Sequence, residues 1–267
     1  MALDPRVASR YDVYDEDERL WTAGRGELIR HRTWDIFARY LPAAGQLLDV
    51  GGGPGTHAAH LATRGYDVTL VEPIARHLVT AARRAEAQHE HRFGVVAGEA
   101  RRLPMPDESV DIVVLMGPLY HLVERVDRDR ALREAARVLR PGGRVLVEAI
   151  SRYAWVLDAT VKDVLATPGI WDNFSWNLRG FSQDPADTRT GEFWAYFHLP
   201  DELHAELADA GLVEIELTGV EVFGRLLGDI ENRMTNPEQL LRAIRLLEHE
   251  PSLLGVSAHI IATATRP

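Results

Sequence analysis

The chain contains 267 residues, with 30 Lys+Arg against 40 Asp+Glu, so its formal charge is −10. With 46% hydrophobic and 26% charged residues and no cysteine, its composition excludes a disordered tail, a collagen-like repeat and a disulfide-stapled secreted module. Binding to nucleic acid is also disfavoured, because a phosphate backbone is usually met by a basic surface.

Residues 1–41 are predicted to form helices rich in aromatic side chains, which lead into the first strand through Pro42. This segment lacks the apolar core of a signal peptide, and no uninterrupted run of about 18 apolar residues follows. We therefore expect a cytoplasmic protein without a membrane span.

Between residues 45 and 150 short apolar runs alternate with amphipathic, Ala- and Arg-rich segments. The runs 46–50, 67–71, 110–116 and 144–150 are predicted to be buried strands, and the segments 56–63, 74–87 and 128–139 to be helices. Successive strands joined by helical crossovers predict an open, doubly wound parallel sheet, whose ligands bind beyond the carboxyl ends of the strands.

Residues 151–198 interrupt this alternation and hold four of the six tryptophans. Connections in compact domains are usually about 4 to 6 residues long, so an insertion of this length is expected to act as a lid or a binding segment. After it we expect a helix at 201–210, a strand at 212–222, a helix at 237–250 and a last strand at 259–265.

The most informative stretch is the glycine-rich loop Gly51-Gly52-Gly53-Pro54-Gly55, which follows a predicted strand and opens a helix. It lacks the lysine of a phosphate-binding Walker loop. If Gly51 and Gly53 are the first two glycines of a dinucleotide fingerprint, the third position falls on Thr56. A nucleoside without a pyrophosphate is the remaining interpretation, with a nicotinamide-dependent oxidoreductase and a non-catalytic binding protein as alternatives.

The pattern Asp49-Val50-Gly51-x-Gly53-x-Gly55 resembles the first motif of class I S-adenosylmethionine-dependent methyltransferases. Glu72, at the end of the second strand, resembles the acid that binds both ribose hydroxyls in that family. Gly98-Glu99-Ala100 resembles the segment that faces the adenine amino group. The resemblance implies S-adenosylmethionine as cofactor, with S-adenosylhomocysteine as product, and Arg32 as the partner of the cofactor's carboxylate. The cofactor-binding residues that it implies are Arg32, Asp49, Gly51, Gly53, Glu72, Pro73, Glu99, Ala100, Met116 and Gly117.

The resemblance also implies a fold. We expect a single α/β domain with a doubly wound, mostly parallel seven-stranded Rossmann-like sheet and helices on both faces. It would be divided into an N-terminal helical cap (1–41), a cofactor-binding core (42–150), a lid insertion (151–198) and the C-terminal part of the sheet (199–267).

The acceptor is expected at the end of the fourth strand, in the stretch Gly117-Pro118-Leu119-Tyr120-His121-Leu122. Family members that methylate base amines have Asn or Asp where Gly117 stands, so a nucleic-acid base is disfavoured. The stretch is similar to that of bacterial family members acting on small molecules. We expect direct displacement onto a small acceptor, on N or O in preference to C, by a monomer or homodimer without a metal.

Candidate groups for chemistry follow from residue type and position. His121 is the first candidate for a general base, because imidazole titrates near neutral pH, and His198 is the second. An aromatic wall can stabilise a sulfonium without competing as a nucleophile. The expected substrate-binding residues are therefore Tyr11, Tyr14, Tyr120, Trp176 and Tyr196.

Overall fold

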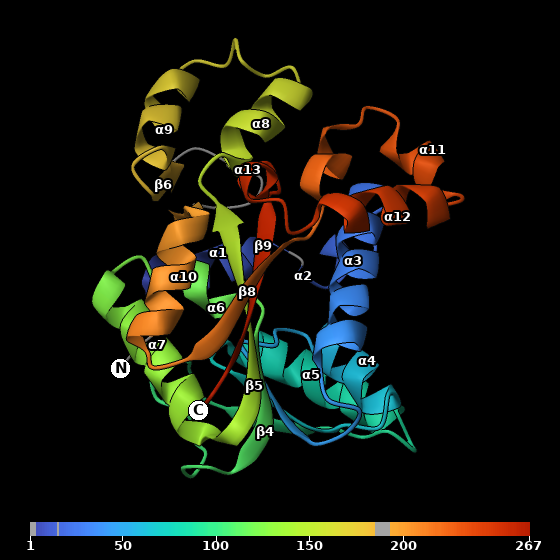
Figure 1. The fold of residues 1–267 in the computed structure, drawn as a ribbon, viewed down its shortest axis with the longest axis vertical. Helices are drawn as coiled ribbons and strands as arrows, with labels where there is room; N and C mark the ends of the chain where they lie inside the picture. Colours follow the sequence, from blue (N-terminus) through green and yellow to red (C-terminus); the bar gives the residue numbers. More distant parts are fainter. Residues whose placement is uncertain (1–3, 15, 185–192) are drawn as a thin grey trace.

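The computed structural model describes residues 4–14, 16–184 and 193–267 and confirms the doubly wound α/β architecture (Figure 1). Its elements up to the fifth strand are α1 (Pro5–Val13), α2 (Glu16–Arg19), α3 (Arg25–Tyr40), β1 (Gln46–Val50), α4 (Thr56–Thr63), β2 (Asp67–Glu72), α5 (Ala75–Ala87), β3 (Gly94–Ala97), β4 (Val110–Leu115), α6 (Pro118–His121), α7 (Arg125–Val138) and β5 (Leu139–Ser151). The remaining elements are α8 (Ala154–Val161), α9 (Ile170–Asn177), β6 (Phe181–Asp184), β7 (Phe193–His198), α10 (Pro200–Asp209), β8 (Val213–Gly219), the 3-10 helix η1 (Val222–Leu226), α11 (Ile230–Met234), α12 (Glu238–Leu247), α13 (Pro251–Leu254) and β9 (His259–Thr265).

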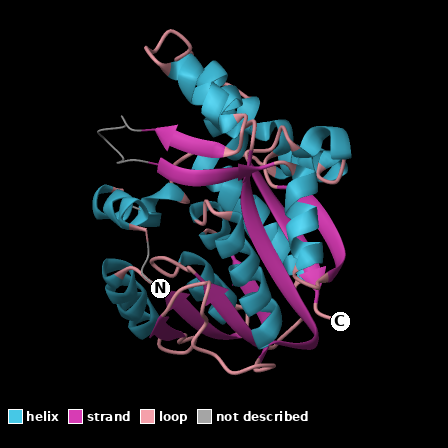
Figure 2. Cartoon of the chain, turned by 90° about the vertical axis from the view of Figure 1, so that its left-hand side faces the viewer, coloured by secondary structure: helices cyan, strands magenta, loops and turns pink. Residues whose placement is uncertain are grey.

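The main sheet of the described chain runs β3-β2-β1-β4-β5-β9-β8, and β9 is antiparallel to both of its neighbours. The hairpin β6–β7 is attached to it where Ile150 and Ser151 of β5 pair with Phe197 and His198. Figure 2 shows this hairpin beside the end of the long strand β5. The expected seven strands are thus joined by two more that the sequence pattern did not indicate.

Helices cover both faces of the sheet, as its strands require. Side chains of α3, α4 and α5 pack on one face around Leu47, Leu70 and Ile112. Side chains of α7 and α10 pack on the other, around Val113 and Val147. These strand residues are at most 1% exposed, which accounts for the continuous apolar runs in the sequence.

Several boundaries differ from the sequence-based prediction. Strand β3 was not predicted, because its four residues are mostly exposed and show no apolar alternation. The helix expected at 237–250 ends earlier, at Leu247, and the short helix α13 after it was not expected. Pro251 takes the first position of α13, where its missing N–H costs nothing. The strand expected at 212–222 ends at Gly219, and η1 begins at Val222.

Three smaller clusters lie outside the main core of the described chain, and one of them joins Ile150 of β5 to Phe197 of β7. Leu28 of α3 packs with Val222, Ile230 and Ile244 of the C-terminal helices. Helices α8 and α9 form a separate cluster that includes Ala159 and Phe174. None of the described helices is long and apolar enough to cross a membrane.

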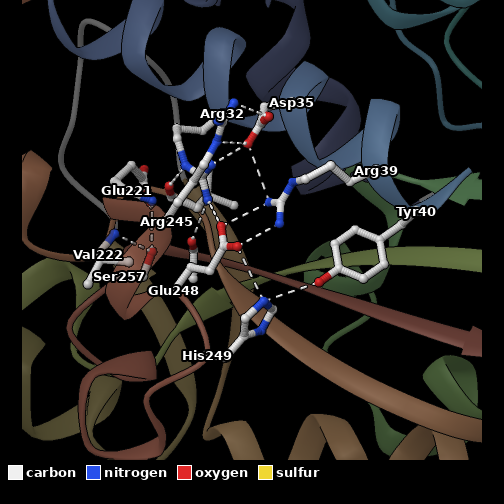
Figure 3. Close-up of polar contacts among 12 residues, drawn as sticks. Arg32, Asp35, Arg39, Tyr40, Glu221, Val222, Arg245, Glu248, His249 and Ser257 are labelled. Carbon is white, nitrogen blue, oxygen red and sulfur yellow. Dashed lines mark hydrogen bonds and ion pairs between the residues drawn. The ribbon is translucent and has the colours of Figure 1, made fainter. Parts of the chain in front are cut away.

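A buried ion-pair cluster, which we call the Arg32 cluster, fastens α3 to the segment after β8 and to the end of α12 (Figure 3). Arg32 is 0% exposed. Its guanidinium donates to Glu248 Oε2, to Asp35 Oδ2 at 2.6 Å and to the Val220 carbonyl at 2.9 Å. Glu248 also accepts from Arg39 Nη1 at 2.6 Å. The cluster satisfies these charges within the protein, as burial demands.

This arrangement generates a stability prediction. Arg32→Met leaves buried oxygens of Glu248 and Val220 short of a partner, so unfolding in urea should show a loss of about 3 to 5 kcal/mol. Arg245→Met is the matched control: Arg245 also pairs with Asp35, but its side chain is 50% exposed. Its loss should stay below about 1 kcal/mol. Equal losses for the two variants would contradict the assignment of Arg32 as a buried structural residue.

Candidate active site

A cavity of about 270 Å³ opens beyond the carboxyl ends of β1, β2 and β4. Val50 of β1 pairs with Val71 of β2 and with Leu115 of β4, so the three strands end at one level. The residues that follow them therefore converge on one space, which is where an open parallel sheet binds ligands. Helices α1 and α2 and residue Trp194 of β7 complete its walls.

The floor of the cavity is the glycine loop between β1 and α4. Gly51 and Gly53 have φ values of +66° and +55°, in the left-handed region that disfavours other residues. A Cβ on Gly51 would collide with the ring of Pro118. The backbone of the loop can thus approach a ligand closely, ahead of the first turn of α4.

Glu72 is held rigidly beside this loop. It is 3% exposed, and its two carboxylate oxygens accept from the backbone N–H groups of Gly53 and Ile74, each at 3.0 Å. Each oxygen retains a second lone pair, so the carboxylate can accept two hydroxyl hydrogen bonds from a ribose. This geometry suits the role that the resemblance implies.

Four buried polar atoms of the cavity lining have no hydrogen-bond partner within the described structure. They are both carboxylate oxygens of Asp49, Oε1 of Glu99 and Nε2 of His77. Burial, with the neighbouring Glu72 carboxylate as the second cause, raises the pKa of Asp49 to about 7. Unpaired buried groups of this kind are costly unless a ligand pairs with them, and the acidic ones suit a cationic ligand that carries an amino group.

The N-terminal helices bring an ion pair to the glycine loop. Arg19 Nε donates to Glu16 Oε1 at 2.5 Å, and Glu16 is the one hydrogen-bond partner of Arg19 among the described residues. A Cβ on Gly53 would lie 3.9 Å from Cγ of Glu16. Burial lowers the pKa of His57, in the first turn of α4, to about 3, and the charge of Arg19 adds to this effect. A guanidinium therefore lines the cavity close to the glycine loop.

A second polar group lies on the wall made by α1, α6 and β7. Tyr11 Oη is 2.8 Å from His121 Nε2, and His121 Nδ1 is 3.3 Å from the carbonyl oxygen of Trp194. Burial lowers the pKa of His121 to about 4, so the ring is neutral at physiological pH. Burial also raises the pKa of Tyr11 well above its ordinary value, so its phenol keeps its proton.

The structure brings most of the predicted site residues together, although their roles stay predictions. The cavity is lined by Tyr11, Asp49, Gly51, Gly53, Glu72, Pro73, Glu99, Ala100, Met116, Gly117, Tyr120 and His121.

The expectation that Arg32 binds the carboxylate of the cofactor is wrong. Its guanidinium is enclosed in the Arg32 cluster and does not line the cavity. The expectation that His198 acts as a base is wrong too. His198 is 0% exposed, and its Nε2 is 3.3 Å from Glu206, which also pairs with the buried Arg128. The pairing of β7 with β5 turns this ring toward α10 rather than into the cavity.

Three of the expected substrate-binding aromatic residues also lie outside the cavity lining. The hydroxyl of Tyr196 accepts from Arg152 and donates to Glu202. Trp176 is 39% exposed on α9. The carbonyl of Tyr14 accepts from Arg76. Within the described part of the insertion 151–198, Trp194 is the residue that lines the cavity. The cover of the cavity, which we call its roof, is therefore provided mainly by α1 and α2.

Sequence reasoning missed Arg19, Glu16 and His77. The run that contains Glu16 and Arg19 is uniformly charged and is typical of a solvated helix, so it gave no signal. His77 could have been found, because it lies in the first helix turn after the strand that ends at Glu72. Its Nδ1 is 3.4 Å from Glu72 Oε1.

The polar groups that line the cavity fit S-adenosylmethionine. A hydrogen-bonded carboxylate, several unpaired acidic oxygens and a guanidinium beside the glycine loop all line one cavity. Residues 4–14, 16–184 and 193–267 contain no group of three or more His, Cys, Asp or Glu side chains placed to hold a metal ion.

Comparison with known proteins agrees with this fit. Residues 48–147 match the family model described as a methyltransferase domain. A ubiquinone/menaquinone biosynthesis C-methyltransferase of Paracoccus denitrificans is 34% identical over 177 residues, which are 65% of this chain and 64% of that protein. A second such enzyme, from Rubrivivax gelatinosus, is 35% identical over 57% of this chain and 55% of its own length. The chain thus spans less than two thirds of these relatives.

Solved structures share the fold. A methyltransferase of Methanosarcina mazei superimposes with a TM-score of 0.60 at 21% identity, over 86% of this chain and 96% of its own. The [4+2]-cyclase SpnF superimposes with a TM-score of 0.57 at 22% identity, over 98% of this chain and 92% of its own.

A longer sequence match decides the family. A protein of Encephalitozoon cuniculi that is named as a methyltransferase is 31% identical over 205 residues, which are 74% of this chain and 81% of that protein. Its extent, the matched domain and the geometry of the glycine loop with Glu72 agree with one another. The chain belongs to the class I S-adenosylmethionine-dependent methyltransferases.

Proposed function

We propose that this protein transfers a methyl group from S-adenosylmethionine to a small-molecule acceptor by direct displacement. The observation that supports this most is the joint placement of the Gly51–Gly53 backbone and the rigid Glu72 carboxylate on the floor of one cavity, under a roof with aromatic residues. When bound, the cofactor supplies an electrophilic methyl group on a sulfonium. The residues of the chain align the two partners, and alignment is the largest expected contribution to the rate.

Individual residues are proposed to divide the work along the cavity. Glu99 and Ala100 face the adenine, Glu72 accepts from the ribose, and Asp49 lies near the positive charges of the methionine part. Just beyond the carboxyl end of β4, a Cβ on Gly117 would lie 3.5 Å from the hydroxyl of Tyr120. This position leaves room for the methyl group and for an acceptor on its far side.

Arg19 is proposed to bind the carboxylate of the cofactor, the role expected of Arg32 from the sequence. Its side chain lines the cavity at the glycine loop and keeps 22% of its surface accessible. Arginine suits this task because its planar N–H groups can bind both carboxylate oxygens.

The identity of the acceptor and its reactive atom stay predictions. The sequence favours N or O over C, whereas the Paracoccus and Rubrivivax relatives are named as C-methyltransferases. We propose that the protein is a cytoplasmic enzyme and that it acts as a monomer or homodimer. Its proposed acceptor is a small molecule and not nucleic acid. The alternatives are a nicotinamide-dependent oxidoreductase and a protein that binds the cofactor without catalysis.

Titration calorimetry with S-adenosylmethionine and with NAD tests the cofactor. The methyl donor should bind and NAD should not. Glu72→Gln should weaken binding of the donor by about 10- to 100-fold, since hydrogen bonds to a charged group contribute about 1.5 to 3 kcal/mol. Glu216→Gln, on the half-exposed side chain of β8, is the matched control and should bind normally. Heat with NAD alone would support the oxidoreductase instead, and binding without S-adenosylhomocysteine formation a non-catalytic protein.

Binding of the donor should depend on pH through Asp49. A cation binds the ionised carboxylate better, and with a pKa of about 7 this group is protonated below neutral pH. Affinity should therefore rise roughly tenfold between pH 5.5 and 7, by proton linkage. His57 and His121, with pKa values of about 3 and 4, are already neutral over this range. In Asp49→Asn the rise should disappear; if it persists, another group is responsible.

The assignment of Arg19 has its own test. Arg19→Met should weaken S-adenosylmethionine binding by about 10- to 100-fold, because a charge-assisted contact is lost. It should leave the affinity for 5′-methylthioadenosine, which lacks the amino-acid part, unchanged. Arg233→Met, whose side chain is 48% exposed on α11, is the matched control. A parallel loss for both ligands would show that Arg19 supports the fold of the cavity rather than the carboxylate.

A further inference from the structure

The pair formed by Tyr11 and His121 has no task in holding the donor, although both residues line the cavity. The hydroxyl of Tyr11 is 2.8 Å from Nε2 of His121, and the two rings meet edge to face with their centroids 5.6 Å apart. On the other side of the imidazole, Nδ1 lies 3.3 Å from the carbonyl oxygen of Trp194. The pair therefore links α1, α6 and β7 through one chain of polar contacts.

The Trp194 carbonyl fixes which group donates in each of these two hydrogen bonds. A backbone carbonyl can only accept a hydrogen bond, so Nδ1 of His121 must donate and carry the proton. In a neutral imidazole Nε2 is then the basic nitrogen, and it accepts the hydrogen of the Tyr11 hydroxyl. The oxygen of Tyr11 keeps its lone pairs for a group in the cavity.

The surroundings of His121 keep the ring neutral. The charged and titratable groups that act on it are Tyr11 and Arg10 of α1, Arg19 of α2 and Tyr120 of α6. On the β7 side it meets the ring of Phe193 and the Trp194 carbonyl. Both charges in this set are positive, and they oppose protonation of the imidazole.

We propose that Tyr11 is the catalytic proton acceptor for a hydroxyl-bearing substrate, a phenol or an enol, and that His121 is the positioning residue that takes the proton which Tyr11 passes on. This inference rests on the proposed function and names its substrate class. The acceptor oxygen forms a bond to the methyl carbon as the carbon–sulfur bond breaks. Its proton moves to Tyr11 Oη while the Tyr11 proton moves to His121 Nε2. The resulting imidazolium returns its proton to water after the products leave.

The weak basicity of the pair is what selects a hydroxyl group. An oxygen that gains a methyl group while it still holds its proton becomes an oxonium, a far stronger acid than imidazolium, so the transfer to His121 is downhill. A methylated amine is an ammonium ion with a pKa of about 10, like that of lysine, and it would not give its proton to this ring. An amine acceptor thus gains nothing from the pair.

The wall around the pair suits a flat, apolar acceptor. Tyr120, Leu122 and Trp194 line the cavity beside it, and the Tyr120 ring lies 4.6 Å from that of His121. Aromatic walls stack favourably with a phenolic ring. They also exclude water, which would otherwise compete for the Tyr11 oxygen.

The test compares two phenols and one amine, namely phenol, 4-nitrophenol and phenethylamine, by following S-adenosylhomocysteine formation from pH 6 to 10. At neutral pH, Tyr11→Phe and His121→Asn should lower kcat for phenol by about 10²- to 10⁴-fold, the usual contribution of a positioned base. Both variants should act normally on 4-nitrophenol at high pH, where this substrate is already ionised. Tyr14→Phe, at the end of the same helix but outside the cavity lining, should match the unaltered protein.

A second readout does not depend on turnover. With ¹⁵N-labelled histidine, the His121 resonances, assigned by comparison with His121→Asn, should report the neutral ring with its proton on Nδ1 at pH 7. A proton on Nε2 at this pH would overturn the proposal, and so would equal losses for both phenols at every pH. Turnover of phenethylamine without turnover of the phenols would also overturn it, while leaving the proposed methyl transfer intact. A lack of donor binding would instead remove the proposed function itself.

Discussion

Burial of carboxylates at the ends of parallel strands is the constraint on which the rest of the site depends. Asp49 and Glu72 are at most 3% exposed, and the two acids lie close enough for Glu72 to raise the pKa of Asp49. The glycine loop satisfies one of these carboxylates, because the backbone N–H of Gly53 donates a hydrogen bond to Glu72. Neither carboxylate oxygen of Asp49 has a close hydrogen-bond partner among the described residues, so the floor retains a negative charge above neutral pH. A positively charged ligand would offset the unfavourable free energy of burying this carboxylate without a counter-charge.

The roof of the cavity follows a different physical logic. Its charges come in compensated pairs, as in Arg19 with Glu16, and its remaining polar contacts join neutral groups such as Tyr11 and His121. Such a roof adds orientation without adding much net charge. The floor therefore favours a cation. In the proposed assignment, Tyr11 of the roof contacts the acceptor, and Arg19 of the roof binds the carboxylate of the donor.

The floor could be predicted from the sequence and much of the roof could not. Gly51 and Glu72 follow buried strands, and parallel strands place their ends together whatever the rest of the chain does. Arg32 and Arg19 both lie near the N-terminus. That Arg32 does not line the cavity depends on its pairing with Glu248, 216 residues away. The direction of His198 depends on the hairpin β6–β7, whose pairing has no signal in the apolar pattern.

The division between floor and roof has an evolutionary consequence. Most of the roof comes from residues 4–14 and 16–20, which pack on the core but supply no strand to the sheet. The Arg32 cluster anchors α3 immediately after it, so the sheet and its glycine loop are stabilised independently of what precedes them. Apart from Arg19, which is assigned to the donor, substitutions in this short stretch can alter the choice of acceptor at little cost to folding or to binding of the donor. The N-terminal helices are thus the part of the molecule where a new acceptor can be accommodated while the floor stays unchanged.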